Sequence, residues 1–366
     1  MRPAALPWDN APIVRTDLIT RLRIRYNRAI RWEFWPAWLY YLPIVSWILW
    51  LGLRYRSLTV FTAANPGIAS GGMVGENKHE ILEPLQNNAS DLVAEFILVP
   101  ASDFATRFAL IAQFVKKVQL PVVLKPNIGG RGRGVMIARC EQDIHDYLNR
   151  CTGEIMAQRY VEGDEFGIFI ARSPEQRTPD IISIVHKTFP QITADGVHTL
   201  RELILADARA QLISAFLFKR WAQELKQTPP KGQIIDLVEI GAHCRGSVFL
   251  NATHLDSPAL RDTLTRLLDA TSGYAFGRID LRAPSSAALA RGKGLQVIEL
   301  NGVTSESAHI YHPDTPLLTG YRAMFRQWSI AFKIGDAYAK RGAHVTTLRE
   351  ILSLWREDMR RGEAWF

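Results

Sequence analysis

The sequence has few cysteines, and their spacing excludes two common kinds of small-domain scaffold. The 366-residue chain holds three, Cys140, Cys151 and Cys244, and no two of them form a CxxC motif. An odd number without that spacing excludes a disulfide framework and a four-cysteine zinc site. We therefore expect a reducing, cytoplasmic setting. No signal peptide is expected, because a long charged stretch precedes the first apolar run.

The chain also lacks the composition of a disordered, collagen-like or coiled-coil protein. Hydrophobic residues make up 47% of it and charged residues 22%, close to the average of globular proteins. A length of 366 residues is too great for one average domain. The composition therefore predicts a globular protein with two or three domains.

Lysine is absent from residues 1–56, although most of the net charge lies there. This segment holds nine Arg and three acidic residues, so it carries +6 of the net charge of +8, and it holds six of the ten Trp. The other residues carry only +2, too little for the basic face that binds nucleic acid. We therefore expect no nucleic acid partner, and a membrane surface as the partner of residues 1–56.

Residues 1–56 combine a basic amphipathic pattern with an uncharged apolar run. Residues 14–31 repeat an apolar residue at every fourth position between arginines, which is typical of an amphipathic helix. Residues 36–53 are uncharged and nearly long enough to cross a bilayer, but Pro43 interrupts them. The favoured interpretation is a segment that lies on or dips into the inner leaflet. The alternatives are a buried hydrophobic hairpin and a true span.

A glycine-rich loop separates two apolar runs. The segment PVVLKPNIGGRGRGV (121–135) places Lys125 before Gly129, Gly130, Gly132 and Gly134. Glycines let backbone N–H groups approach an anion closely. The loop is neither a Walker A nor a Rossmann motif, because no GK[ST] ends it and a strand follows it. The pattern predicts a hairpin flap over phosphates, with basic side chains at its root and tip; a flexible basic turn is the alternative.

Two short strands near the end of the sequence carry paired polar residues. GRIDLR spaces Arg278 and Asp280 by two, and QVIELNG does the same for Glu299 and Asn301, so each pair shares one strand face. Side by side, these strands would offer three oxygen ligands and a guanidinium, which suits Mg²⁺ that bridges ATP phosphates. An extended hairpin tip is expected between them, at 283–294. A further strand is expected at 57–64.

The order of these motifs resembles the ATP-grasp ligases, such as D-alanine–D-alanine ligase and the ATP-grasp half of cyanophycin synthetase. The resemblance covers residues 120–310 well and 57–120 loosely. It implies an α+β (α/β) ATP-grasp fold with a reduced N-terminal α/β domain and an added N-terminal hydrophobic helical segment. The predicted domains are 1–56, basic and Trp-rich; 57–120, a short pre-grasp α/β domain; 121–335, the ATP-grasp domain with a glycine-loop and a metal-binding subdomain; and 336–366, an amphipathic helix.

The resemblance also implies the roles of individual residues. Those expected at ATP are Lys78, Lys125, Gly129, Gly130, Arg131, Gly132, Arg133 and Gly134 for the phosphates, and Gln158, Arg159, Tyr160, Val161 and Glu165 for adenosine. One or two Mg²⁺ ions, with Mn²⁺ as a substitute, are expected on Asp280, Glu299 and Asn301. Arg278, Lys187 and Arg245 are expected at the transferred phosphoryl group, and His309, Tyr311 and His312 at the substrate. The alternatives are a solvated lysine at 187, a surface charge at 165 and a structural loop at 305–313.

The reaction that the resemblance implies is ATP-dependent ligation. A carboxylate attacks the γ-phosphate to give an acyl phosphate and ADP, and an amine then displaces phosphate. A hydrophobic or membrane-borne substrate is expected, because residues 1–56 carry none of the motifs. The alternatives are a grasp-fold kinase that phosphorylates a small molecule without ligation, and a membrane-bound, non-catalytic ATP-binding protein.

Overall fold

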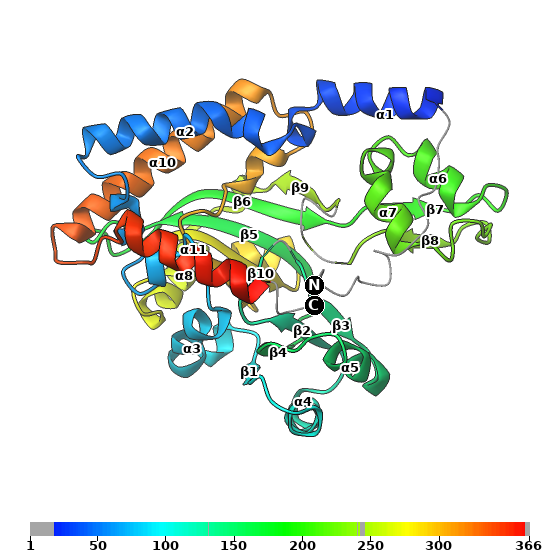
Figure 1. Cartoon of the computed structure of the whole chain (residues 1–366), viewed down its shortest axis with the longest axis horizontal. Helices are drawn as coiled ribbons and strands as arrows, with labels where there is room; N and C mark the ends of the chain where they lie inside the picture. The colour runs from blue at the N-terminus through cyan, green and yellow to red at the C-terminus, as the bar shows by residue number, and fades with distance from the viewer. Residues whose placement is uncertain (1–17, 131, 240, 242–245, 363–366) are drawn as a thin grey trace. The chain divides into compact units, whose positions relative to one another are not determined.

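The computed structural model describes residues 18–130, 132–239, 241 and 246–362, and their contacts divide the chain into two compact units (Figure 1). The larger unit takes its described residues from 44–187 and 249–366, and the smaller unit from 2–43 and 188–248. Each unit is described by itself below. The domain boundaries given above stay a prediction.

Two sheets form the framework of the larger unit (Figure 1). One has the strand order β1-β4-β2-β3, and the other has the order β11-β10-β5-β6-β9. Their strands are β1 (Phe96–Val99), β2 (Val122–Pro126), β3 (Met136–Ala138), β4 (Ile155–Arg159), β5 (Asp164–Ala171), β6 (Asp180–Thr188), β9 (Val248–Asn251), β10 (Phe276–Ala283) and β11 (Gln296–Asn301).

Strand β5 lies at the centre of the second sheet and is buried on both faces, which explains its almost continuous apolar sequence. Ile168 on one face joins a core with α3 (Lys78–Asn88), α8 (Pro258–Ala270) and α9 (Ser286–Ala290). Phe169 on the other face joins a core with α2 (Ala37–Arg54) and α10 (Leu317–Ala339). Helices α4 (Phe104–Val118) and α5 (Glu141–Leu148) pack on the first sheet.

The smaller unit is built from short elements around its own core. They are α1 (Leu18–Ile30), β7 (Gln191–Thr193), α6 (Leu200–Ala206), η5 (Ala210–Ile213), α7 (Ser214–Arg220) and β8 (Ile234–Asp236). Thr199 and Glu202 form a capping box that starts α6.

Two short segments fold differently from the prediction. Residues 57–64 do not form the expected strand: Val60–Ala64 is a 3-10 helix (η2), buried against α10 instead of paired with a strand. Residues 283–294 do not form an extended hairpin tip, because α9 lies within them. Its alanines favour a helix, and the Ser285 hydroxyl caps it by accepting the Ala288 N–H.

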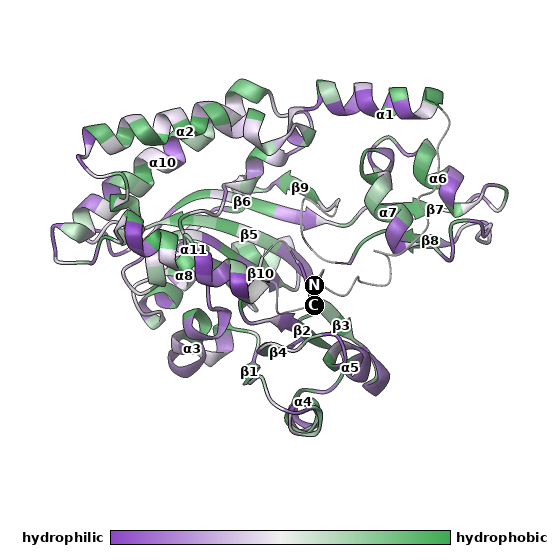
Figure 2. Cartoon of the chain, viewed as in Figure 1, coloured by the Kyte–Doolittle hydropathy of each residue, from purple (hydrophilic) through white to green (hydrophobic). Residues whose placement is uncertain are grey.

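Residues 37–54 form one helix, α2, which contains Pro43. In the larger unit the indole Nε1 of Trp47, on α2, donates to the Phe325 carbonyl oxygen of α10 at 3.1 Å. One side of α2 therefore packs on α10. In Figure 2, α2 alternates between hydrophobic and near-neutral residues. Among the described helices, none combines the length and apolar character needed to cross a bilayer. The last helix, α11 (Leu348–Gly362), buries Ile351 but exposes Leu352 and Trp355.

Candidate functional site

Strands β10 and β11 bring four of the predicted polar residues together. Their antiparallel register pairs Arg278 with Asn301 and Asp280 with Glu299. Opposite residues in such a pair have Cβ atoms about 5 Å apart. The alternation of side chains then places all four on one patch of the sheet, as their spacing in the sequence predicted.

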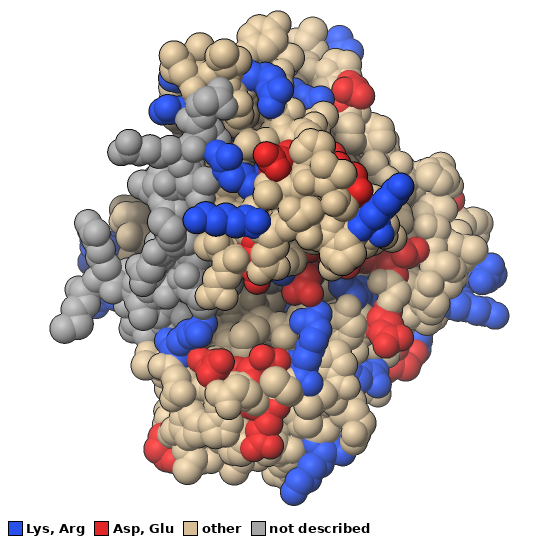
Figure 3. All heavy atoms as spheres, turned by 90° about the vertical axis from the view of Figure 1, so that its right-hand side faces the viewer, with Lys and Arg blue, Asp and Glu red and all other residues tan. Residues whose placement is uncertain are grey.

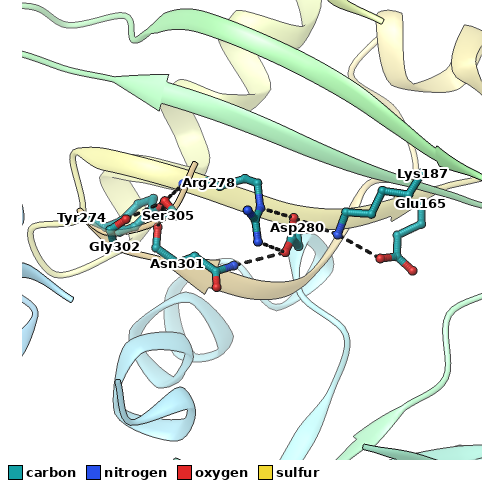
Figure 4. A network of polar contacts seen from close by, with 8 residues as sticks. All are labelled: Glu165, Lys187, Tyr274, Arg278, Asp280, Asn301, Gly302 and Ser305. Carbon is teal, nitrogen blue, oxygen red and sulfur yellow. Dashed lines mark hydrogen bonds and ion pairs between the residues drawn. The ribbon is translucent and has the colours of Figure 1, made fainter. Parts of the chain in front are cut away.

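Asp280 is the centre of a buried ion network (Figure 4). Its carboxylate accepts from Arg278 Nε at 2.9 Å and Nη2 at 3.1 Å. Lys187 Nζ lies 3.0 Å from Asp280 Oδ1, and Asn301 Nδ2 donates to Oδ2 at 3.2 Å. Gly167 faces Asp280 from β5, and a Cβ there would lie 3.0 Å from Asp280 Oδ1. Glycine at 167 therefore leaves room for the network.

The opposite charges of this network shift the pKa values of their partners in favour of the ionised forms. Burial alone would raise the pKa of the Asp280 carboxyl, but Arg278 and Lys187 hold that pKa below its usual range. Burial alone would lower the pKa of Lys187, but Asp280 and Glu165 raise that pKa above its usual value. The Asp280 carboxylate and the Lys187 ammonium are therefore both ionised at neutral pH. Lys187 is not the solvated lysine of the alternative interpretation, because it is 4% exposed.

Glu165 extends the network toward the segment between β4 and β5. Its Oε1 accepts from Lys187 Nζ at 3.0 Å, and its Oε2 lies 3.3 Å from Arg282 Nη2. Arg282 also donates to the Tyr160 hydroxyl at 3.0 Å and to the Val161 carbonyl oxygen at 2.8 Å. Glu165 is therefore a buried ion-pair partner and not a surface charge. Arg282, which the sequence did not single out, therefore holds the segment 158–161 that is expected at adenosine, called the hinge below.

Two further lysines lie on the opposite side of the network, where the first sheet approaches β11. Lys125 Nζ in β2 donates to Gln158 Oε1 at 2.8 Å and to the Ile298 carbonyl oxygen at 2.9 Å. Lys78 Nζ lies 3.7 Å from Glu299 Oε1 and also donates to the Gly129 carbonyl oxygen. Burial lowers the pKa of Lys125 to about 8, and repulsion from Lys78 adds to this.

The glycine loop joins β2 to β3 as an antiparallel hairpin, as predicted. Its two ends are fixed: Asn127 Nδ2 donates to Glu154 Oε2 at 3.0 Å, and the Tyr147 hydroxyl donates to the Gly134 carbonyl oxygen at 2.7 Å. Between them Gly129 has φ 145°, which only glycine adopts readily, and a Cβ on Gly130 would meet nothing within 4 Å. Gly132 and Arg133 lie in this open part. The loop is thus anchored at both ends and open at its centre.

The predicted hinge is ordered by contacts with neighbouring strands. Gln158 Nε2 donates to the Ala94 carbonyl oxygen at 3.2 Å. Arg159 N donates to the Glu95 carbonyl oxygen at 2.8 Å, and Arg159 Nη2 donates to Gln296 Oε1 at 2.9 Å. With Tyr160 held by Arg282, the hinge backbone is positioned on both sides.

The loop after β11 contains a carboxyl group that the sequence did not single out. Glu306 Oε2 accepts from the Tyr311 hydroxyl at 2.6 Å, whereas its Oε1 is buried and has no hydrogen-bond partner. Burial raises the pKa of Glu306. Tyr311 reaches the ring of Phe249, over which Lys187 Nζ lies at 5.9 Å, so this loop borders the network. His309 Nδ1 is buried without a partner.

The remaining predicted residues lie apart from this geometry. His312 Nδ1 accepts from Asn251 N at 3.1 Å, a contact that anchors the loop. Arg131 and Arg245 lie outside the described residues.

Glu76, which was not predicted, accepts from Gly302 N at 2.6 Å, and burial raises the pKa of its carboxyl to about 7. Only its place just before Lys78, in a glycine-rich loop, hinted at this position.

The donor set suits a metal that arrives with a phosphate ligand. Asp280 and Asn301 are bonded within the network, whereas Glu299 is partly exposed and forms an ion pair with Lys78. Over the part of the chain that the structure describes, no group of three His, Cys, Asp or Glu side chains could hold a metal ion. Mg²⁺ is usually held by one or two carboxylates together with phosphate oxygens and water. These residues therefore fit a nucleotide-bound Mg²⁺ better than an independent metal centre.

Comparison with protein families connects this geometry to a known domain. Residues 77–167 match the profile of the RimK-like ATP-grasp domain. The matched segment contains Lys78, Lys125, the glycine loop, the hinge and Glu165. It ends before Lys187 and the β10–β11 residues. No curated protein matches the sequence.

Solved structures that resemble the chain do so at low identity. D-alanine–D-alanine ligase from Bacillus anthracis has 14% identity and a TM-score of 0.42, covering 75% of this chain and 71% of its own. A bifunctional glutathione synthetase from Pasteurella multocida has 18% identity and a TM-score of 0.37, covering 72% and 38%. Carboxyaminoimidazole ribonucleotide synthase from Aspergillus clavatus has 12% identity and a TM-score of 0.38, covering 68% and 51%. The chain thus spans little more than a third of the glutathione synthetase.

These likenesses are too distant to carry an argument, and the family match is the informative comparison. It covers the glycine loop and the residues expected at adenosine but not the paired residues of β10 and β11, and the structure is the expected mixture of helices and sheets. The predicted resemblance to ATP-grasp proteins is thereby confirmed for the segment 77–167.

Proposed function

We propose that the chain is an ATP- and Mg²⁺-dependent ligase that activates a carboxylate as an acyl phosphate and joins it to an amine. The observation that carries this proposal is the buried network of Lys187, Asp280 and Arg278. It borders Lys125, which lies within the segment that matches the ATP-grasp domain. Burying cations beside two carboxylates costs desolvation free energy, so the presence of this network supports a role in binding or catalysis.

In this proposal the protein acts mainly by positioning and electrostatics. When bound, Mg²⁺ would be held by Asp280, Glu299 and Asn301 and would neutralise phosphate charge. Lys125 and Lys78 would bind phosphate oxygens below the glycine loop, whose backbone N–H groups would contact the same phosphates. Lys187 and Arg278 are fixed by Asp280, so they stabilise the charge on the transferred group without having to reorganise.

The amine is assigned to the loop after β11. Glu306 Oε1 is a buried oxygen without a partner, beside Tyr311 and the Phe249 ring above which Lys187 lies. A carboxyl group with a raised pKa there can accept a proton from the attacking amine.

The proposal is tested by a phosphate-release screen of carboxylate and amine pairs, with products identified by mass. A ligase releases phosphate only when both substrates are present, and the product contains both. Release of ADP with a stable phosphorylated product and no need for an amine would instead identify a kinase. No turnover across a broad screen that includes amphiphilic acids and lipid head groups would favour a non-catalytic ATP-binding protein.

Replacement of Glu299 by Gln is expected to weaken Mg²⁺-dependent ATP binding at least about tenfold, because the amide donates where the metal needs an anionic oxygen. Isothermal titration with and without Mg²⁺ measures this. The matched control is Glu141→Gln, an exposed carboxylate on α5. If Glu299→Gln binds Mg·ATP as tightly as the parent, the metal assignment is wrong.

ATP affinity is expected to fall as the pH rises through about 8, since the pKa of Lys125 is about 8 and its positive charge is lost above it. The decrease should approach about tenfold per pH unit. Lys125→Arg keeps its charge, so its affinity should stay flat over this range. Glu76 is present in both proteins, and the difference between their pH profiles therefore isolates Lys125. A parent affinity that stays constant up to about pH 9.5 would contradict the assignment of Lys125.

A further inference from the structure

Helix α1 presents its apolar side chains to the solvent. Leu18, Leu22, Tyr26 and Ile30 recur at every fourth position, and each is more than half exposed, with Tyr26 at 67%. A surface helix of a globular protein normally turns such a stripe toward the core. The face of α1 that packs is instead the one with Thr20, Ile24 and Asn27.

Contacts within the smaller unit fix α1 in this orientation. Arg23 Nη2 donates to the Leu205 carbonyl oxygen at 3.2 Å, and Arg28 Nη1 donates to the Leu212 carbonyl oxygen at 3.3 Å. The guanidinium of Arg28 also lies over the Phe34 ring at 5.8 Å. The apolar stripe, defined here as Leu18, Leu22, Tyr26 and Ile30, is therefore held outward by the fold.

The charges beside the stripe indicate what covers it. Helix α1 contains four arginines and no acidic residue. Arg21 and Arg25 are exposed and directly precede Leu22 and Tyr26, so they flank the stripe. Figure 3 shows that basic and acidic side chains are interspersed on the face of the molecule that it draws. Helix α11 also exposes apolar residues, but Glu350, Glu357 and Asp358 lie among its arginines.

The next helix continues this character. In its part within the larger unit, α2 buries Leu51 but exposes Val45, Leu49, Trp50 and Leu53. The guanidinium of Arg54 lies 5.6 Å from the centre of the Trp50 ring. Tryptophan and arginine beside exposed aliphatic residues are typical of segments at the membrane interface.

We propose that the apolar stripe of α1 docks on an anionic lipid bilayer. A bilayer surface accepts an apolar stripe a few ångströms deep and attracts the flanking arginines. A second copy of this chain is a poorer occupant, because two α1 helices face to face would bring arginines of like charge together. The proposal is independent of the ligase reaction.

The test is co-sedimentation of the full chain with vesicles of phosphatidylcholine and phosphatidylglycerol in equal parts, compared with pure phosphatidylcholine. The parent should bind the mixed vesicles at least about tenfold more tightly. Leu22→Glu with Tyr26→Glu should lower that affinity at least about tenfold, and Arg21→Gln with Arg25→Gln about 25-fold. The matched control, Val197→Glu with Ile234→Glu, alters exposed apolar residues elsewhere in the smaller unit and should bind like the parent.

Two results would overturn the proposal. One is a parent that does not bind the mixed vesicles, and the other is equal binding by the parent and the Leu22→Glu, Tyr26→Glu variant. Sedimentation velocity adds a third outcome: a parent dimer that this variant dissociates, without vesicle binding, would assign the stripe to a second copy. Circular dichroism and phosphate release should be unchanged in the variant, so a failure here leaves the ligase proposal untouched.

Discussion

Asp280→Asn is expected to abolish turnover and to lower the free energy of unfolding by about 3–5 kcal/mol, since it leaves buried cations without their shared anion. Arg278 donates two hydrogen bonds to this carboxylate, and Lys187 lies 3.0 Å from it. The asparagine is nearly the same size, so loss of charge and not of volume is measured. Urea unfolding followed by circular dichroism gives the stability, and phosphate release gives the turnover.

The matched control for this variant is Asp269→Asn. Asp269 also pairs with an arginine, Arg172, but its side chain is 61% exposed. An exposed pair contributes about 1 kcal/mol or less, so the stability of this variant should stay close to that of the parent. Equal stability losses for Asp280→Asn and Asp269→Asn would show that the network does not hold the charges that the structure assigns to it.

Lys187→Met should lower turnover about 100- to 1000-fold, because it removes a fixed cation from the position where phosphoryl charge develops. Stability should change less than in Asp280→Asn. Without Lys187, Asp280 keeps Arg278 and Glu165 keeps Arg282 as an ion-pair partner. The variant therefore separates catalysis from folding.

The control for the lysine variant is Lys117→Met on α4. Lys117 pairs with Glu95 at the surface, where its side chain is 69% exposed. Its turnover and stability are expected to match those of the parent. Lys187→Met with unchanged turnover would show that Lys187 is a structural cation only.

Local pattern was enough to predict the elements that carry the site. Alternation in GRIDLR and QVIELNG put Arg278 with Asp280 and Glu299 with Asn301 on strand faces, and the register of β10 and β11 joins them. The glycine-rich segment forms the expected hairpin. Local pattern predicts a segment less well when its packing partners are distant in sequence. A strand was predicted at 57–64, but contacts with α10 make Val60–Ala64 a 3-10 helix.

The residues that sequence reasoning missed act only through tertiary contacts. Arg282 lies two residues beyond Asp280, yet its importance depends on the bonds to Tyr160 and Val161, more than a hundred positions away. The sequence gives Gly167 no feature that distinguishes it from other strand glycines, and its role follows only from the position of Asp280 opposite it. Glu306 has no motif of its own, and only its unpartnered buried oxygen marks it. Pairing and burial decide these roles, and spacing along the chain does not encode them.

The central claim, attack of a carboxylate on ATP, is tested most directly by following an oxygen atom. Acids from the phosphate-release screen are labelled with ¹⁸O in the carboxylate, and the released phosphate is analysed by mass spectrometry. An acyl phosphate formed at the Lys187, Asp280 and Arg278 network transfers one carboxylate oxygen to phosphate when the amine displaces it. The account predicts phosphate that carries one ¹⁸O atom. Unlabelled phosphate, released while ATP is turned over and the amide product forms, would contradict it.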